Sequence, residues 1–214
     1  MKHIAPLTLV LLMLMPLTSR AQRIHAFLSS GMAASQIEGD ELKGFNHFGY
    51  TGGVGALTAL SANGRWGMSV EAAFSQRGAY NNSGDPYSIK LNLNYVDIPL
   101  LVHYQDPYGG MLLGLGVEYS RLVQQPHNTM KYNDKYFIPD TSDMTFLPND
   151  LSVVADARFT IWRGLQFNLR WQHSLLPVKE LWTFTEYKNN GLTVVRHSNY
   201  CYNHSIIVRL IYQF

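Results

Sequence analysis

The sequence predicts an all-β protein, an eight-stranded antiparallel up-and-down transmembrane β-barrel. Three observations predict this fold class. Apolar and polar residues alternate along eight stretches, which is the period of a strand with two unlike faces. The connections between these stretches are alternately short and long, and aromatic residues gather at the ends that the short connections join. The stretches lie near residues 23–36, 48–61, 65–80, 89–105, 109–123, 150–162, 165–175 and 204–214.

The alternation is clearest toward the C-terminus. In GLQFNLRWQ, the apolar Phe167, Leu169 and Trp171 share one face, and polar residues take the other. The terminal HSIIVRLIYQF has an apolar residue at every second place from Ile206 to Phe214. Because successive side chains of a strand point to opposite faces, each stretch is expected to present one apolar face and one polar or mixed face.

The connections indicate which kind of barrel this is. Bacterial outer-membrane barrels have short periplasmic turns and long external loops, whereas a compact soluble domain seldom carries two structureless loops of more than about 15 residues. The short connections contain the Gly, Pro and Asn that tight turns favour. The long ones are 37–47, 81–88, 124–149 and 176–203, and the short ones are 62–64, 106–108 and 163–164.

The placement of aromatic residues decides which face meets lipid. A soluble lipocalin-like barrel would show the same alternation with its apolar face inward. Aromatic girdles at a membrane interface, in contrast, would collect aromatic residues at one end of the strands. We therefore expect apolar side chains outside and polar ones in the lumen. The aromatic residues at the short-turn ends are Trp66, Tyr104, Tyr108, Trp162, Tyr212 and Phe214.

The N-terminus predicts export. A basic start, an apolar stretch and a small-residue site at Ala21 have the layout of a secretory signal, so residues 1–21 are expected to be cleaved and residues 22–214 to form one barrel domain in the cell outer membrane. Removal of Lys2 and Arg20 leaves 17 − 2 = 15 basic residues against 15 acidic ones. This balance gives no reason to expect nucleic-acid binding. Cys201 is the only cysteine, so no internal disulfide is expected.

Two motifs carry a resemblance to a known family. One strand ends in SQRG at residues 75–78, and the next contains YVDIPLL at residues 95–101. The pair resembles the PorT-like family of Gram-negative outer-membrane β-barrels, although Asp97 stands where a Glu is more usual. The resemblance implies that some members serve protein secretion across the outer membrane. It also implies that the final aromatic, Phe214, is recognised by the barrel-insertion machinery.

The YVDIP segment predicts a local irregularity. Leu91, Leu93 and Tyr95 place apolar residues at odd positions, whereas the apolar residues from Val96 onward occupy even positions. If both sets face lipid, a β-bulge near residue 95 or 96 must reconcile them. The same shift directs Asp97 into the lumen.

The inward positions are rich in charge. An eight-stranded barrel is just wide enough for side chains to fill, and buried charges persist only when they are paired. We therefore expect a structural charge network that plugs the lumen, with a narrow small-solute pore as the alternative. Its members are Glu71, Arg77, Lys90, Asp97, Glu118, Asp156, Arg158, Arg170 and Arg209.

An enzyme with an active site at the rim is the other alternative. A nucleophile, a base and an orienting acid could assemble near the ends of two strands, but no spaced motif fixes them, so no catalytic residue is assigned. The scattered histidines also lack the spacing of metal ligands, and neither metal nor cofactor is expected. The residues considered are Asp143, Asp150, His173, Ser174 and His204 for catalysis, and His127, His197 and His204 for metal.

The long loops suggest binding. Exposed aromatics mixed with Asn and Lys occur in YNDKYF, LWTFTEYKNN and SNYCYN, a composition that suits contact with protein or glycan and equally suits loops that pack on one another. The sequence therefore predicts a non-catalytic outer-membrane barrel that acts as a binding or assembly component. Its partners would be outer-membrane lipid, the insertion machinery, and a protein or glycan held by loops 124–149 and 176–203.

Overall fold

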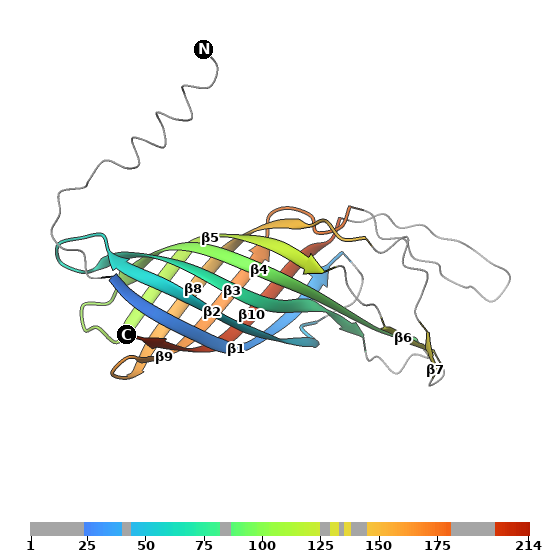
Figure 1. Ribbon diagram of the computed structural model, residues 1–214, viewed down its shortest axis with the longest axis horizontal. Helices are drawn as coiled ribbons and strands as arrows, with labels where there is room; N and C mark the ends of the chain where they lie inside the picture. The colour runs from blue at the N-terminus through green and yellow to red at the C-terminus, as the bar shows by residue number, and fades with distance from the viewer. Residues whose placement is uncertain are drawn as a thin grey trace, which may run out of the picture.

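The computed structural model is a closed eight-stranded antiparallel β-barrel, as the sequence predicts (Figure 1). It describes residues 24–39, 44–81, 87–124, 129–132, 135–137, 145–180 and 200–214. The predicted signal segment 1–21, half of loop 124–149 and most of loop 176–203 lie outside these residues. The barrel strands are β1 (Ile24–Glu38), β2 (His47–Ala59), β3 (Trp66–Asn81), β4 (Tyr87–Gln105), β5 (Met111–Gln124), β8 (Asn149–Trp162), β9 (Leu165–Ser174) and β10 (Tyr202–Gln213).

Each barrel strand pairs with its neighbours in the order β1-β2-β3-β4-β5-β8-β9-β10, and β10 pairs with β1 to close the ring. The closing register sets Phe27 opposite Gln213 and Glu38 opposite Tyr202. A closed ring leaves no strand edge unpaired, which is what a bilayer requires. No helix that is long and apolar enough to cross a membrane occurs among the described residues.

The sequence did not predict two short strands. β6 (Thr129–Tyr132) pairs with the first residues of β4, and β7 (Lys135–Phe137) pairs with β6. Together they extend the sheet beyond the barrel wall at its long-loop end (Figure 1).

The two faces of the wall differ as expected. Leu169 and Trp171 on β9 are exposed, whereas the intervening Arg170 is 2 % exposed. The C-terminus and the short turns lie together at one end of the barrel, on the left in Figure 1. The predicted girdle residues at this end are exposed, and two pairs of them touch edge to face, Trp66 with Tyr104 and Tyr212 with Phe214. The outer surface therefore presents apolar side chains around the middle of the wall and a girdle of aromatic residues at the short-turn end.

The predicted change of phase in β4 is wrong. Leu91, Leu93 and Tyr95 are buried together with Asp97, so odd positions point inward from Leu91 to His103. A register shift does occur between Asn94 and Tyr95, but the extra residue, Val123, belongs to the partner strand β5. The bulge therefore lies in β5 and leaves β4 in a single phase.

The inward apolar residues of β4 join a cluster that fills the lumen near its long-loop end. Phe146 and Val178, from the segments beside β8 and β9, pack into it and are buried. These side chains shield the interior from the external side, which explains why apolar residues face inward here. The cluster consists of Ile37, Ala79, Leu91, Leu93, Tyr95, Leu122, Phe146, Val178 and Cys201.

Candidate functional site

Charged side chains from six strands meet in the lumen below this apolar cluster. All are at most 4 % exposed, because the strand alternation directs them inward. We call them the luminal charge cluster: Glu71 and Arg77 on β3, Asp97 on β4, Glu118 on β5, Asp150, Asp156 and Arg158 on β8, Arg170 on β9, and Arg209 on β10.

Arg77 organises the part of the cluster nearest the apolar residues. Its Nη2 lies 2.8 Å from Asp97 Oδ1 and 2.7 Å from Glu118 Oε1, and its Nη1 lies 3.6 Å from Asp150 Oδ2. The guanidinium also lies over the ring of Tyr95, 4.9 Å from its centroid. One guanidinium thus forms ion pairs with three carboxylates from three different strands.

Arg170 organises the other part. Its Nε donates to Asp156 Oδ2 at 2.9 Å, its Nη2 donates to Glu71 Oε2 at 3.2 Å, and its Nη1 lies 3.6 Å from Glu118 Oε2. Arg209 Nη1 donates to Glu71 Oε1 at 2.9 Å. Because Glu118 contacts both Arg77 and Arg170, the two parts form one connected network.

Neutral side chains complete the hydrogen bonding of the carboxylates. Asn168 Nδ2 donates to Asp156 at 3.0 Å, and Ser174 Oγ donates to Asp150 at 2.7 Å. Several donors on one buried carboxylate fix it in position. The interior therefore has the chemistry of a cross-link between strands.

Eight of the nine charged residues predicted for the lumen lie in this cluster, and Lys90 does not. Lys90 is exposed because the even positions of β4 point outward. The additional member is Asp150, which the sequence placed at the rim because it begins a strand. Its burial and its contacts with Arg77 and Ser174 show that β8 carries it into the lumen.

The residues considered for a rim enzyme do not converge. Ser174 is buried and points into the lumen toward Asp150, whereas His173 and His204 lie on the outer face of β9 and β10 beside Glu38. Adjacent positions of one strand point in opposite directions, so Ser174 and His173 are separated by the barrel wall. Asp143, His127 and His197 lie outside the described residues.

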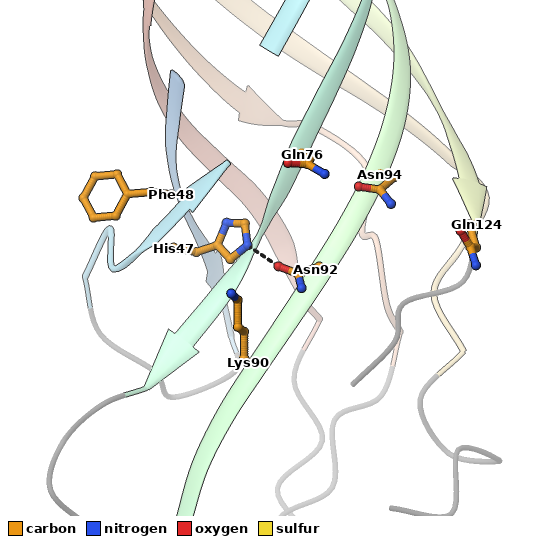
Figure 2. A pocket seen from close by; sticks show the side chains of 7 residues that line it. All are labelled: His47, Phe48, Gln76, Lys90, Asn92, Asn94 and Gln124. Carbon is orange, nitrogen blue, oxygen red and sulfur yellow. Dashed lines mark hydrogen bonds between the residues drawn. The ribbon is translucent and has the colours of Figure 1, made fainter. Parts of the chain in front are cut away.

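A polar pocket of about 390 Å³ lies at the long-loop end of β2 to β5 (Figure 2). Figure 2 shows the His47 ring reaching Asn92, with 2.7 Å between His47 Nε2 and Asn92 Oδ1, and Lys90 beside this pair. Ser35 Oγ lies 3.0 Å from the other ring nitrogen and holds the ring from behind. The lining residues are His47, Phe48, Gln76, Lys90, Asn92, Asn94 and Gln124.

Four of the seven residues that line the pocket carry carboxamide side chains. Gln76, Asn92, Asn94 and Gln124 each offer a carbonyl acceptor and an amide donor. Phe48 adds an exposed aromatic ring at the edge of the pocket. Strand periodicity does not bring these residues together, because they come from four strands, β2 to β5. The available signal was the polar pair Asn92 and Asn94 on a face that otherwise meets lipid.

Residues 7–195 match the family model described as outer membrane protein beta-barrel domain. The chain belongs to this family. Membership agrees with the closed barrel, the apolar outer surface and the girdle of aromatic residues at the short-turn end. It also supports an outer-membrane location.

Solved structures of bacterial outer-membrane barrels are similar in fold at low identity. The attachment invasion locus protein Ail of Yersinia pestis is 14% identical with a TM-score of 0.46, covering 89% of this chain and 98% of that chain. Neisserial surface protein A is 8% identical with a TM-score of 0.46, covering 89% and 97%. OprG from Pseudomonas aeruginosa is 14% identical with a TM-score of 0.38, covering 90% and 97%. No curated protein matches the chain.

Proposed function

We propose that this member of the outer-membrane barrel family is a non-catalytic binding protein whose ligand occupies the pocket at the long-loop end. The pocket carries the proposal. It gathers four carboxamides, a lysine and an aromatic side chain on the wall of a rigid barrel. Binding residues are commonly held in this way, at the ends of a scaffold that does not itself move.

The lining indicates a saccharide ligand. Vicinal hydroxyl groups of a sugar both donate and accept hydrogen bonds, which matches the paired donor and acceptor of each carboxamide. Phe48 can cover the apolar face of a sugar ring. Lys90, which is exposed, can pair with an acidic group. We therefore propose a glycan that carries an acidic group as the occupant of this pocket.

The sequence-based expectations for export, barrel insertion and loop partners also belong to this proposal. Residues 1–21 would direct export and be cleaved, and Phe214 would serve recognition by the insertion machinery. The PorT-like resemblance would place the protein among barrels that work with partners at the membrane. A protein or glycan partner of loops 124–149 and 176–203 would also belong to this proposal.

Binding of acidic oligosaccharides to the refolded protein in detergent micelles tests the proposal. A panel of acidic and neutral oligosaccharides is titrated by calorimetry against wild type, Asn94→Ala and Lys90→Ala. Loss of a pocket hydrogen bond typically costs about 1 kcal/mol and loss of a charged one about 1.5–3 kcal/mol, so binding should weaken roughly fivefold or more in each variant. Arg65→Ala, an exposed arginine at the opposite end, is the control.

Two outcomes would refute the pocket as the binding site. One is that no oligosaccharide of the panel binds to wild type. The other is that binding survives unchanged in both pocket variants.

A further inference from the structure

Three potential metal ligands meet on the outer face of the wall, away from the pocket. His173 and His204 are direct partners in the pairing of β9 with β10. Glu38 on β1 pairs with Tyr202, which places it diagonally two residues from His204 on the same face. One ligand atom from each of Glu38, His173 and His204 lies within 4.8 Å of the others.

Aromatic side chains hold the two imidazoles in position. The His173 ring lies nearly parallel to the indole of Trp171, with centroids 6.0 Å apart and an interplanar angle of 5°, and it also lies beside Tyr202. Phe45 contacts the His204 ring edge to face at 4.9 Å. Flanking rings limit the orientations of both imidazoles, which lowers the entropy that a metal would have to overcome on binding.

We propose that Glu38, His173 and His204 bind a divalent transition metal, with Zn²⁺ as the reference ion. Two imidazoles and a carboxylate are a set that zinc accepts, with a fourth position left for water or another donor. Mg²⁺ and Ca²⁺ prefer oxygen ligands throughout, so they do not fit a set with two nitrogen ligands. The sequence analysis considered His173 and His204 only for a rim enzyme and His204 only with other histidines for a metal, because Glu38 joins them only where β1 pairs with β10 in the closed barrel.

The geometry allows the site to close. Zinc bonds of about 2.0–2.2 Å in a tetrahedron put ligand atoms roughly 3.3–3.5 Å apart. His204 Nδ1 already lies 2.8 Å from Glu38 Oε1. The Glu38 side chain is 44% exposed and can rotate. Closure therefore requires side-chain rotation without movement of the strands.

The hydrogen bonds of His204 indicate which ring nitrogen carries the proton that a bound metal would replace. Trp171 Nε1 donates to His204 Nε2 at 2.7 Å, so the neutral ring carries its proton on Nδ1 and donates it to Glu38. A metal on Nδ1 takes the place of this proton, and a neutral ring then carries its proton on Nε2. An Nε2–H cannot accept a hydrogen bond from the indole N–H, so the hydrogen bond between Trp171 and His204 has to break when the metal binds. Zinc binding should therefore change the fluorescence of Trp171.

Calorimetry with ZnCl₂ on protein refolded in detergent micelles, purified without a polyhistidine tag, tests the site. Wild type should bind one Zn²⁺ per chain at the site. His173→Gln and His204→Gln should each weaken Zn²⁺ binding by more than about 10- to 100-fold. That range is typical of losing a residue that only hydrogen-bonds to a metal ligand. His25→Gln, a histidine at the opposite end of the barrel, is the matched control and should bind as wild type does. Migration on unboiled gels verifies that each variant has folded.

Tryptophan fluorescence provides a second readout. Zinc should produce a saturable change in wild type that Trp171→Phe loses, while calorimetry still detects zinc binding to Trp171→Phe. MgCl₂ and CaCl₂ at the same concentrations should produce no change. Failure of wild type to bind Zn²⁺, or binding that is equally strong in folded His173→Gln and His204→Gln, would overturn the proposal. Neither result bears on the glycan pocket, which shares no residue with this site.

Discussion

Arg170 and Glu71 face each other across the barrel, with 3.2 Å between Nη2 and Oε2. β9 and β3 are four strands apart in either direction around the eight-stranded ring, so this ion pair spans the lumen along a diameter. Arg170 also contacts Asp156 and Glu118. A single guanidinium therefore connects three parts of the wall.

Arg170→Ala should destabilise the barrel strongly. Removing one partner of a buried ion pair leaves an uncompensated charge, which typically costs about 3–5 kcal/mol. The measurement is the free energy of unfolding in denaturant, with the protein in lipid vesicles. Arg65→Ala, which removes an exposed arginine, should change it by less than about 1 kcal/mol. Equal stability of the two variants would show that the luminal charges are not energetically coupled.

The same network predicts that the barrel does not conduct. An eight-stranded barrel is just wide enough for side chains to fill, and here the lumen holds the luminal charge cluster and an apolar cluster beyond it. Planar-bilayer recordings of wild type should show no steady ohmic current, whereas a porin inserted in the same bilayer supplies the positive control. A steady current from pure, folded protein would favour the small-solute pore instead.

A charged residue on the outward face of β9 should destabilise the barrel. Leu169 is 43% exposed at mid-strand, between the inward Asn168 and Arg170. Leu169→Arg should cost roughly 2–4 kcal/mol, since an arginine on the lipid face near the bilayer midplane costs that much. Tyr108→Arg, at the short-turn end, should cost about 0–1 kcal/mol. If Leu169→Arg unfolds at the same denaturant concentration as wild type, the assignment of this face to lipid is wrong.

Cys201 should be unreactive in the folded protein. Its side chain is fully buried within the apolar cluster, and burial in apolar surroundings suppresses thiol chemistry. A maleimide should label it only after unfolding, as read by mass spectrometry. Ala62→Cys in a Cys201→Ser background places a thiol on an exposed turn and should react at once. Rapid labelling of Cys201 in the folded barrel would show that the long-loop end opens to solvent.

The strands could be predicted from the sequence because their two faces differ in polarity. The alternation around Leu169 in β9 is enough to place that strand and its direction of burial. Polarity alone failed where the lumen itself is apolar. Leu91 and Leu93 read as lipid-facing residues, although they point inward and pack against Phe146 from a distant connection.

The sites depended on contacts that strand periodicity does not reveal. Eight of the luminal charges could be predicted, since inward charges in a narrow barrel have only one another as partners. Which carboxylate meets which arginine depends on the register and shear of the closed barrel, and so does the meeting of Glu38 with His204. The short β6–β7 hairpin was not predicted, because strands of four and three residues are too short to show a clear alternation of apolar and polar residues.

The seam between β1 and β10 has a consequence for the rate of folding. In its register Phe27 pairs with Gln213, so the seam joins positions 213 − 27 = 186 residues apart in sequence. Every other pairing in the ring joins strands that follow one another along the barrel. Loop-closure entropy opposes contacts between distant residues, and chains rich in such contacts fold slowly. Formation of the seam should therefore limit the speed of assembly, and a substitution along it would change the time the barrel takes to close even where it leaves the final stability unaltered.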